Sequence, residues 1–269
     1  MKKLVYLLVC ACFSLISCDN DDTITLTVDT SAYDVVKDLK DIEGNLYFTD
    51  KLADGLQIRI SYLVLRQDKN QVSIVSSATR YISDIKSIAS YTTDELEPGE
   101  YSVIVASDFV KGNTEFNEVT VDNQYEGFSI SCSESAGVYN AFGTAYMSDI
   151  TVDSKKTVTL NTIRRGSLVT FLLKNTDRMT DKSYSLTMEK FTYTAYGHFA
   201  EDFSYRTETM RHTWTTGVKG VQHYCATTGA VIDPMALSWQ GTSLQKKLSN
   251  GKDVIFELDF ASGKATSKP

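Results

Sequence analysis

The chain has few of the residues that carry most enzymatic and metal chemistry. Its 269 residues include three histidines, five cysteines and three prolines. The motifs of serine hydrolases, zinc proteases, nucleotide-binding loops, dinucleotide-binding folds and calcium loops are absent. We therefore expect no enzyme, no cofactor and no metal site. The scarcity of proline also excludes a proline-rich stalk.

Positive charge is also scarce, and it is not clustered. The whole chain has a net charge of −7. Loss of Lys2 and Lys3 with a signal peptide would leave 25 basic residues against 34 acidic ones, a net charge of −9. A field of that sign repels the phosphate backbone. The sequence therefore predicts no nucleic-acid partner, and it leaves protein and sugar partners open.

Long hydrophobic runs are missing except at the start of the chain. Leu4 to Ile16 is apolar, follows Lys2-Lys3, and is too short to span a bilayer as a mature helix. The segment Leu15-Ile16-Ser17-Cys18 resembles the lipobox of bacterial lipoproteins, in which the chain is cleaved before a cysteine that receives lipid. The resemblance implies a lipoprotein signal peptide at 1–17 and acyl chains such as palmitate on Cys18, which would bind the protein to a membrane. The alternative is an ordinary secretory signal in which Cys18 is incidental.

An acidic cluster follows Cys18 directly. Asp19-Asn20-Asp21-Asp22 lies in a short segment, 18–23, that we interpret as a tether. It resembles the acidic export tag that sends some lipoproteins of Gram-negative anaerobes to the outer face of the outer membrane. The alternative is a simple solvated linker, with the protein facing the periplasm. We therefore predict an outer-membrane protein, lipid-anchored and exposed at the cell surface.

Only two cysteines remain after those of the signal peptide and lipid site. Cys132 and Cys225 are far apart in a compartment that permits disulfides. They could form a bridge, or each could be a small buried hydrophobe. The sequence leaves both alternatives open.

Short strands separated by turns dominate the rest of the chain. Alternation or β-rich composition predicts strands at 23–28, 44–48, 56–65, 72–75, 101–106, 116–121, 143–147, 157–160, 167–173, 183–196 and 254–260. Tyr33 to Ile42 breaks the alternation and predicts a short helix or turn. A polar break at Asp122-Asn123-Gln124 suggests two all-β sandwich domains, at 24–122 and 123–262, followed by a loose tail at 263–269.

Several segments together resemble the fimbrillin-like proteins, the fimbrial and minor anchor subunits of Gram-negative anaerobes. They are the lipobox, the strand entry at 96–103 (LEPGEYSV), the element Ala145–Ser148, and the pattern around Arg164-Arg165-Gly166. The resemblance implies two tandem immunoglobulin-like or transthyretin-like sandwiches and protein partners bound by strand addition. Polymerising members are cut at an arginine beyond an N-terminal strand. Here the first arginine after Cys18 is Arg59, inside the expected strand 56–65, so a shaft subunit is disfavoured and an anchor, a tip or a non-polymerising component is favoured.

Aromatic residues are frequent in the second half, and they give an alternative function. Exposed aromatic planes stack on sugar rings, whereas alternate aromatics in a sandwich usually fill the core. Trp214, in a polar stretch, is the preferred candidate for glycan binding, and Trp239 is the second. The leading hypothesis is a surface protein with a structural or adhesive role. The alternative is a glycan-binding lipoprotein of a polysaccharide-uptake system.

Overall fold

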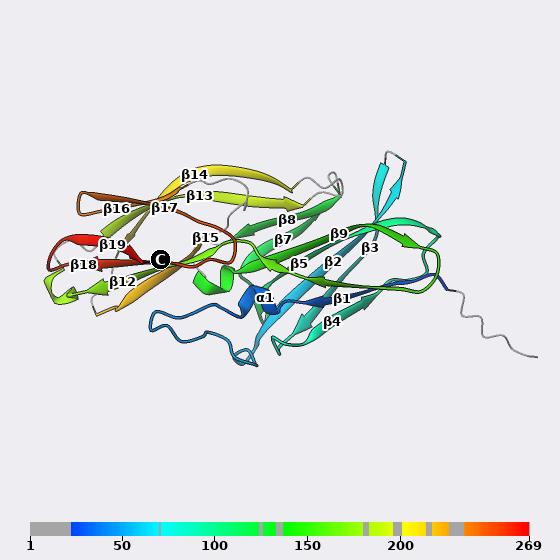
Figure 1. Ribbon diagram of the computed structural model, residues 1–269, viewed down its shortest axis with the longest axis horizontal. Coiled ribbons are helices and arrows are strands. Elements are labelled where there is room, and N and C mark those ends of the chain that lie inside the picture. The colour runs from blue at the N-terminus through cyan, green and yellow to red at the C-terminus, as the bar shows by residue number, and fades with distance from the viewer. Residues whose placement is uncertain are drawn as a thin grey trace, which may run out of the picture.

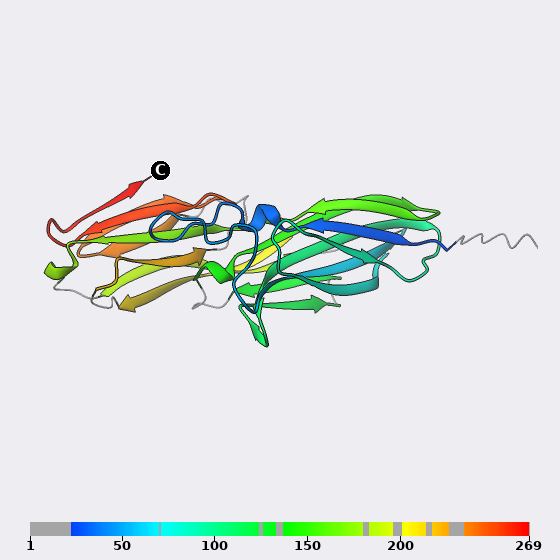
Figure 2. The same ribbon diagram turned by 90° about the horizontal axis from the view of Figure 1, so that it is seen from below.

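A computed structural model describes residues 23–69, 71–123, 126–132, 137–179, 183–195, 201–213, 217–225 and 234–268. The predictions of a signal peptide, of lipid on Cys18 and of an acidic tether fall outside these residues almost entirely. The described chain is an elongated all-β molecule, with one group of sheets at each end of its long axis (Figures 1 and 2). The predicted all-β class is therefore confirmed.

Two sheets form the half nearer the N-terminus. The smaller sheet consists, in spatial order, of β10 (Lys156–Asn161), β1 (Leu26–Ser31) and β4 (Ile88–Thr92). The larger sheet consists, in spatial order, of β11 (Ile163–Arg164), β9 (Phe142–Val152), β5 (Gly99–Lys111), β2 (Leu56–Asp68) and β3 (Gln71–Ile82). The short β6 (Thr114–Glu115) pairs with the end of β5. Tyr62 of β2 donates a hydrogen bond to the Ala89 carbonyl of β4 at 3.1 Å, so the two sheets face each other.

Two further sheets form the other half. The smaller one consists, in spatial order, of β15 (Gly220–Cys225), β12 (Ser167–Lys174), β18 (Val254–Asp259) and β19 (Lys264–Lys268). The larger one consists, in spatial order, of β17 (Thr242–Lys247), β16 (Pro234–Trp239), β13 (Ser183–Ala195), β8 (Gly127–Cys132) and β7 (Asn117–Asp122). The long β14 (Glu201–Thr213) pairs with β13 along its whole length.

The sheets do not divide the chain at the polar break. β9 pairs with β5, and β10 pairs with β1, although both lie beyond residue 122. β7 and β8 are linked to β13 in one sheet, yet Phe128 and Ile130 of β8 pack in the apolar cluster of the first half, so this sheet spans both halves. The predicted boundary between 24–122 and 123–262 is therefore wrong, because β9 and β10, which follow residue 122, complete the two sheets of the first half. Local composition marks turns, and it carries no information on which sheet a strand will join.

The segment from Tyr33 to Ile42 contains a short helix, as predicted. α1 spans Tyr33–Val36 and buries Val35 and Val36. Two further single turns, η1 (Gly137–Asn140) and η2 (Thr176–Arg178), are also short. Within the described residues no helix is both long and apolar enough to cross a membrane.

The strand predicted at 44–48 is wrong. The segment forms only one isolated bridge, between Lys40 and Leu46. The Asp41 carboxylate accepts backbone hydrogen bonds from Glu43 and Asn45, each at 2.9 Å. Such local bonds from an aspartate compete with the sheet ladder, so this stretch becomes a turn.

The strands predicted from apolar runs are the ones whose side chains fill the two hydrophobic cores. The stretch from Ile58 to Leu65 of β2 is buried throughout, and its apolar run from Tyr62 to Leu65 is typical of a central strand. One apolar cluster lies mainly within the first pair of sheets. A second cluster surrounds Phe171, Phe256 and Trp239 in the second pair.

The two halves are joined by packed contacts. Arg164 of β11 is buried and donates to the Gly251 carbonyl at 2.7 Å, and it pairs with Asp253 at 3.1 Å. Burial raises the pKa of Asp253, and the Arg164 guanidinium opposes that shift. At a second contact between the halves, the Gln222 amide of β15 donates a hydrogen bond to the Lys40 carbonyl at 2.8 Å. Its amide oxygen accepts a hydrogen bond from the Tyr47 hydroxyl. The loop after α1 is thereby fixed to the second half.

Candidate interaction surfaces

The N-terminal strand is built into the middle of its sheet. β1 pairs in parallel with β10 over six residues and antiparallel with β4 over five. Its alternation sends Leu26, Val28 and Thr30 into the core, where none of the three is exposed. A strand with partners on both sides and a buried face is an integral part of the fold. Its loss would open a groove of its own length in the sheet.

The first arginine after Cys18 is inaccessible. Arg59 lies in β2 and forms two hydrogen bonds with Asp108 of β5, both at 2.9 Å. It also pairs with Glu115 at 2.6 Å and donates to the Asn117 carbonyl at 3.2 Å. Burial raises the pKa of Asp108 to about 6, against the opposing effect of Arg59. An arginine in a central strand with its guanidinium so engaged offers no site to a protease.

The edge of the larger sheet is a candidate surface for strand addition. β3 is the last strand in its sheet and pairs only with β2 among the described strands. Most of its side chains are exposed, with Tyr81 55% and Val75 42% exposed. Proteins usually protect edge strands with lysine, proline or short length. The sequence of β3, QVSIVSSATRYI, has twelve residues, no lysine, no proline and only one charge, on Arg80.

One irregularity limits how a partner could pair with β3. The register between β2 and β3 shifts between Val64 and Leu65, so that Val75 has no direct partner on β2. A bulge of this kind bends an edge strand and increases its twist. The regular stretch from Ser76 to Ile82 is therefore the part best suited to accept another strand.

The predicted glycan-binding residues are not brought together. Trp239 is only 2% exposed and packs edge-to-face on Phe260, with ring centroids 5.2 Å apart. An indole buried in this way has no free face for a sugar, so Trp239 is a core residue, which corrects the second glycan-binding prediction. Trp214 lies outside the described residues, as does Cys18, and both assignments stay predictions.

The cysteines and histidines that could have formed a metal site or a disulfide are buried in the core or have side chains outside the described part. Cys225 is buried in the second core, and the side chain of Cys132 is outside the described part. His223 is 9% exposed and packs against Phe171 with centroids 5.9 Å apart. In the described ranges, no group of three or more His, Cys, Asp or Glu residues could hold a metal ion.

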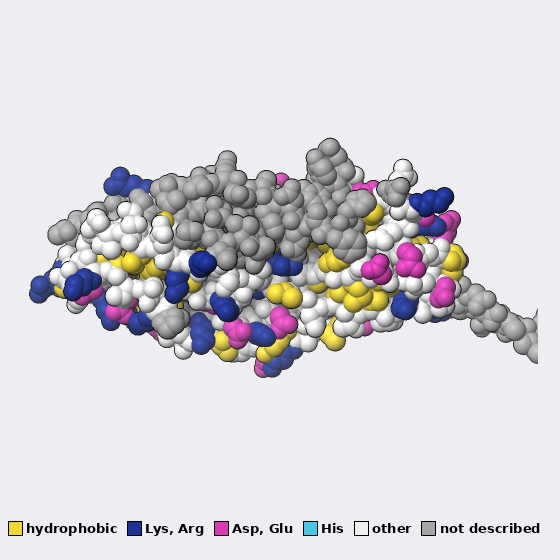
Figure 3. Space-filling model, turned by 45° about the horizontal axis from the view of Figure 1, so that its top comes forward, with side chains coloured by type: hydrophobic (Ala, Val, Ile, Leu, Met, Phe, Trp, Pro, Cys, Tyr) yellow, Lys and Arg dark blue, Asp and Glu magenta, His cyan; other side chains and the backbone are white. Residues whose placement is uncertain are grey.

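The exposed charges do not define a single surface either. On the face drawn in Figure 3, basic and acidic side chains are interspersed over the described residues, and hydrophobic side chains form small groups between them. Sequence reasoning missed the β3 edge. The uncharged run from Gln71 to Thr79 is the sequence feature that indicates a long edge strand, whereas the alternation pattern predicts a strand only at Val72 to Val75.

Several solved structures share the fold of this chain. A candidate cell adhesion protein from Bacteroides uniformis matches with a TM-score of 0.54 at 11% identity, covering 93% of this chain and 97% of that one. A candidate adhesin from Bacteroides thetaiotaomicron matches with a TM-score of 0.53 at 8% identity, covering 91% and 96%. The tip fimbrial protein Mfa3 from Porphyromonas gingivalis, with a C-terminal truncation, matches at 10% identity with a TM-score of 0.46, covering 91% and 97%.

No family model and no curated protein sequence matches the chain. Identities this low show a shared fold and leave activity open. The β-sandwich fold that the resemblance to fimbrillin-like proteins implies is confirmed.

Proposed function

We propose that this chain is a lipid-anchored cell-surface protein with a structural or adhesive role, either an anchor, a tip or a non-polymerising component of a fimbrium-like assembly. The observation that carries the proposal is the fold, which it shares over more than nine-tenths of its length with a candidate cell adhesion protein and a candidate adhesin. The lipobox at Cys18 and the acidic segment after it support attachment to the outer face of the outer membrane. Such a role requires no catalytic chemistry.

The geometry of β1 favours a component that keeps its N-terminal strand. β1 is paired on both sides, and Arg59 is buried. No arginine lies between Cys18 and Arg59, so an arginine-specific protease has no position at which to remove β1 alone. The groove that a polymerising subunit would need therefore stays filled by the chain itself. An exposed edge, β3, remains for contact with a protein partner by strand addition.

The cellular location and the adhesive role can be tested in one set of strains. A deletion strain is complemented with the wild-type chain, with Cys18→Ser, or with a β3 variant carrying Ser77→Lys and Thr79→Lys. Adherent cells are counted under flow, and surface exposure is measured by protease shaving of intact cells. A matched variant, Asn113→Lys with Ser154→Lys, adds the same charge in exposed turns.

We expect Cys18→Ser to lose both surface exposure and adherence. The β3 variant should stay at the surface and lose adherence, because lysines on an edge strand oppose pairing with another chain. The matched variant should behave like wild type. Adherence that is unchanged in the deletion strain would overturn the adhesive role. Loss of adherence in Cys18→Ser but not in the β3 variant would exclude the β3 edge as the contact surface and leave the proposed lipid anchor standing.

The glycan-binding alternative loses one of its two predicted residues. Trp239 is in the core. Trp214 is the one of the two candidates that remains, and binding to a glycan array by the mature protein, compared with Trp214→Ala, tests it.

A further inference from the structure

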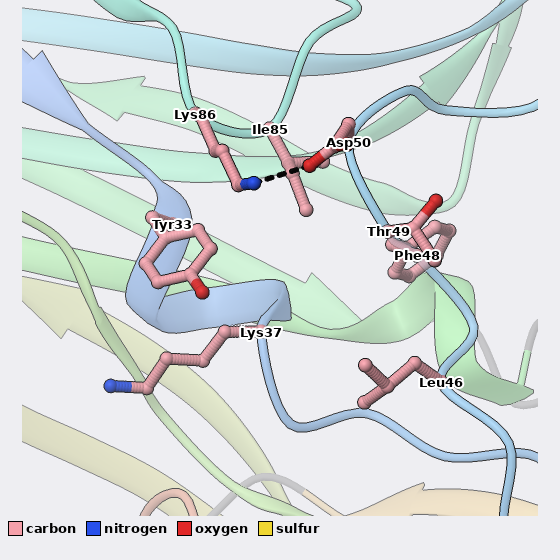
Figure 4. A pocket seen from close by; sticks show the side chains of 8 residues that line it. All are labelled: Tyr33, Lys37, Leu46, Phe48, Thr49, Asp50, Ile85 and Lys86. Carbon is pink, nitrogen blue, oxygen red and sulfur yellow. Dashed lines mark ion pairs between the residues drawn. The ribbon is translucent and has the colours of Figure 1, made fainter.

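A small pocket lies beside α1, and no residue of β3 and neither tryptophan is among the residues that line it. Its volume is about 240 Å³, and its walls come from α1, the loop at 46–50 and the turn at 85–86. Eight residues line it, and these are Tyr33, Lys37, Leu46, Phe48, Thr49, Asp50, Ile85 and Lys86 (Figure 4). Drug-sized ligands generally occupy larger cavities, so this one fits a ligand of about one ring.

Two of the walls are held firmly by the backbone. Ile85 donates to the Asp50 carbonyl and Leu52 to the Ser83 carbonyl, each at 3.0 Å. An isolated bridge between Lys51 and Asp84 lies between them. The two loops are thus linked like a short sheet. A pocket that is already formed loses little conformational entropy when a ligand binds.

The floor of the pocket is apolar and fixed in the core. Phe48 and Ile85 are almost fully buried, and Phe48 stacks on Phe109 with centroids 5.0 Å apart. Above this floor, Tyr33 is 38% and Leu46 is 47% exposed. They are two of only seven large hydrophobic side chains that are exposed in the described residues. Both line the same pocket, and exposed apolar side chains that gather in one hollow are typical of a ligand-binding site.

The rim of the pocket is polar and close to electrically neutral. Lys86 pairs with Asp50, which raises the pKa of the lysine. Lys37 pairs with Asp34 at 2.7 Å. In Figure 4 the Lys37 ammonium points away from Asp50 and Lys86, so its alkyl stem lines the pocket. An anionic ligand would have to compete with carboxylates that already neutralise both lysines.

We propose that this pocket binds one neutral sugar residue of a glycan. A pyranose ring has an apolar C–H face, which would pack on Tyr33 and Leu46, and hydroxyls, which would exchange hydrogen bonds with Asp50, Lys86 and Thr49. A purely apolar ligand would remove water from the Asp50–Lys86 pair and offer it no hydrogen bond, at a cost in free energy. The site uses none of the residues of the β3 edge, so it stands independently of the adhesive role.

Saturation-transfer NMR on the mature protein in a sugar-free detergent tests the site. The probes are a panel of neutral hexoses, deoxyhexoses and N-acetylhexosamines, with glucuronate as the anionic arm. At least one neutral sugar should receive saturation. Its dissociation constant should rise about tenfold in Tyr33→Ala, because an aromatic stacking contact contributes on that order.

Two further variants keep this test decisive. Leu46→Ala changes an exposed loop side chain and should weaken binding without affecting the fold, which the thermal midpoint checks. Tyr81→Ala removes an exposed tyrosine on β3 and should leave sugar binding unchanged. No saturation for any neutral sugar, stronger binding of glucuronate, or equal binding by Tyr33→Ala and wild type would each overturn the proposal.

Discussion

Arg59 and Asp108 show how much of this fold depends on single charged side chains. Both are nearly inaccessible to solvent, yet their two parallel hydrogen bonds at 2.9 Å satisfy much of each other's bonding capacity. A buried pair of this kind adds little net stability over an apolar pair, because desolvation offsets the attraction. Breaking it from one side is different, since the buried Arg59 guanidinium would lose both hydrogen bonds to Asp108 and keep only the partly exposed Glu115 as an ionic partner.

Asp108→Ala should therefore lower the free energy of unfolding by about 3–5 kcal/mol. Urea denaturation measures it. The pair of the exposed Lys174 with Glu257 gives the comparison, and Lys174→Ala should cost less than about 1 kcal/mol, since Glu257 keeps Lys268 as a partner. Replacing both partners, with Arg59→Met and Asp108→Leu, should recover most of the loss. A double variant as unstable as Asp108→Ala would show that the pair itself stabilises the fold.

Asp259 gives the chain a local acid sensitivity. Its carboxylate accepts hydrogen bonds from the Asn175 amide at 2.6 Å, the Ser262 hydroxyl at 2.7 Å and the Ala261 backbone at 3.0 Å. These bonds hold the pKa of Asp259 at about 2, below its usual value. A depressed pKa in the folded state stabilises the fold above the unfolded value and ceases to do so as the pH falls toward the folded value.

Asp259→Asn should therefore destabilise the protein more at pH 5 than at pH 2.5. Urea midpoints of the variant and the wild type at the two pH values measure this difference. Asp177→Asn, at an exposed carboxylate in the neighbouring turn η2, is the control and should show the same small effect at both pH values. An equal effect of Asp259→Asn at both would contradict the role of the ionised carboxylate.

At the scale of elements, we expect the stability of the first half to depend strongly on β1. It is the middle strand of its sheet, between β10 and β4, and it supplies Leu26 and Val28 to the core. The strand order means that the chain needs residues 26–31, 88–92 and 156–161 together to close one sheet. Such long-range pairing forms late and slowly in folding.

Leu26→Ala should cost about 2–5 kcal/mol, because the buried side chain leaves a cavity next to strands fixed on both sides. Thr27→Ala on the opposite face removes only a hydroxyl contact with Thr92 at 2.8 Å, and it should cost less than about 1.5 kcal/mol. Urea denaturation of both variants measures the two costs. Similar losses in the two variants would mean that β1 contributes through its backbone alone.

At the scale of the whole molecule, the position of β1 determines how the protein bears load. Figure 1 shows β1 entering from the end of the long axis where the chain begins, with the second half at the other end. If the N-terminus is held at a membrane, as we propose, and the chain is pulled from its far end, tension runs along β1. β1 and β10 are parallel, so such tension would load their hydrogen bonds in shear, many at once.

Pulling the chain between its termini should therefore give a single high rupture force, measured by atomic force microscopy. Asp29→Pro removes a backbone N–H from β1 and should lower that force. Thr266→Pro in β19 adds the same residue to the strand that is loaded at the other end of the chain, and it should leave the force that separates β1 from β10 unchanged. A wild-type chain that unfolds gradually at low force would contradict shear loading of β1.

The sequence alone determined the class of this protein and the places of most of its strands, because alternation and turn residues are local signals. The alternation of Leu26 and Val28, the apolar run in β2 and the turn before β5 were each readable from neighbouring residues. The lipobox at Cys18 is equally local and remains a prediction from sequence.

Only the tertiary structure decided how the strands are shared between the halves. β9 and β10 belong with β5 and β1 through pairings across tens of residues, which no local pattern encodes. The same is true of Trp239, whose aromatic character fits a sugar site and a core equally well until its neighbours are known. The Tyr33 pocket likewise exists because the bridge between Lys51 and Asp84 brings two distant turns together beside α1. Contacts of this kind depend on the path of the whole chain, since burial and pairing are properties of packed sheets rather than of single segments.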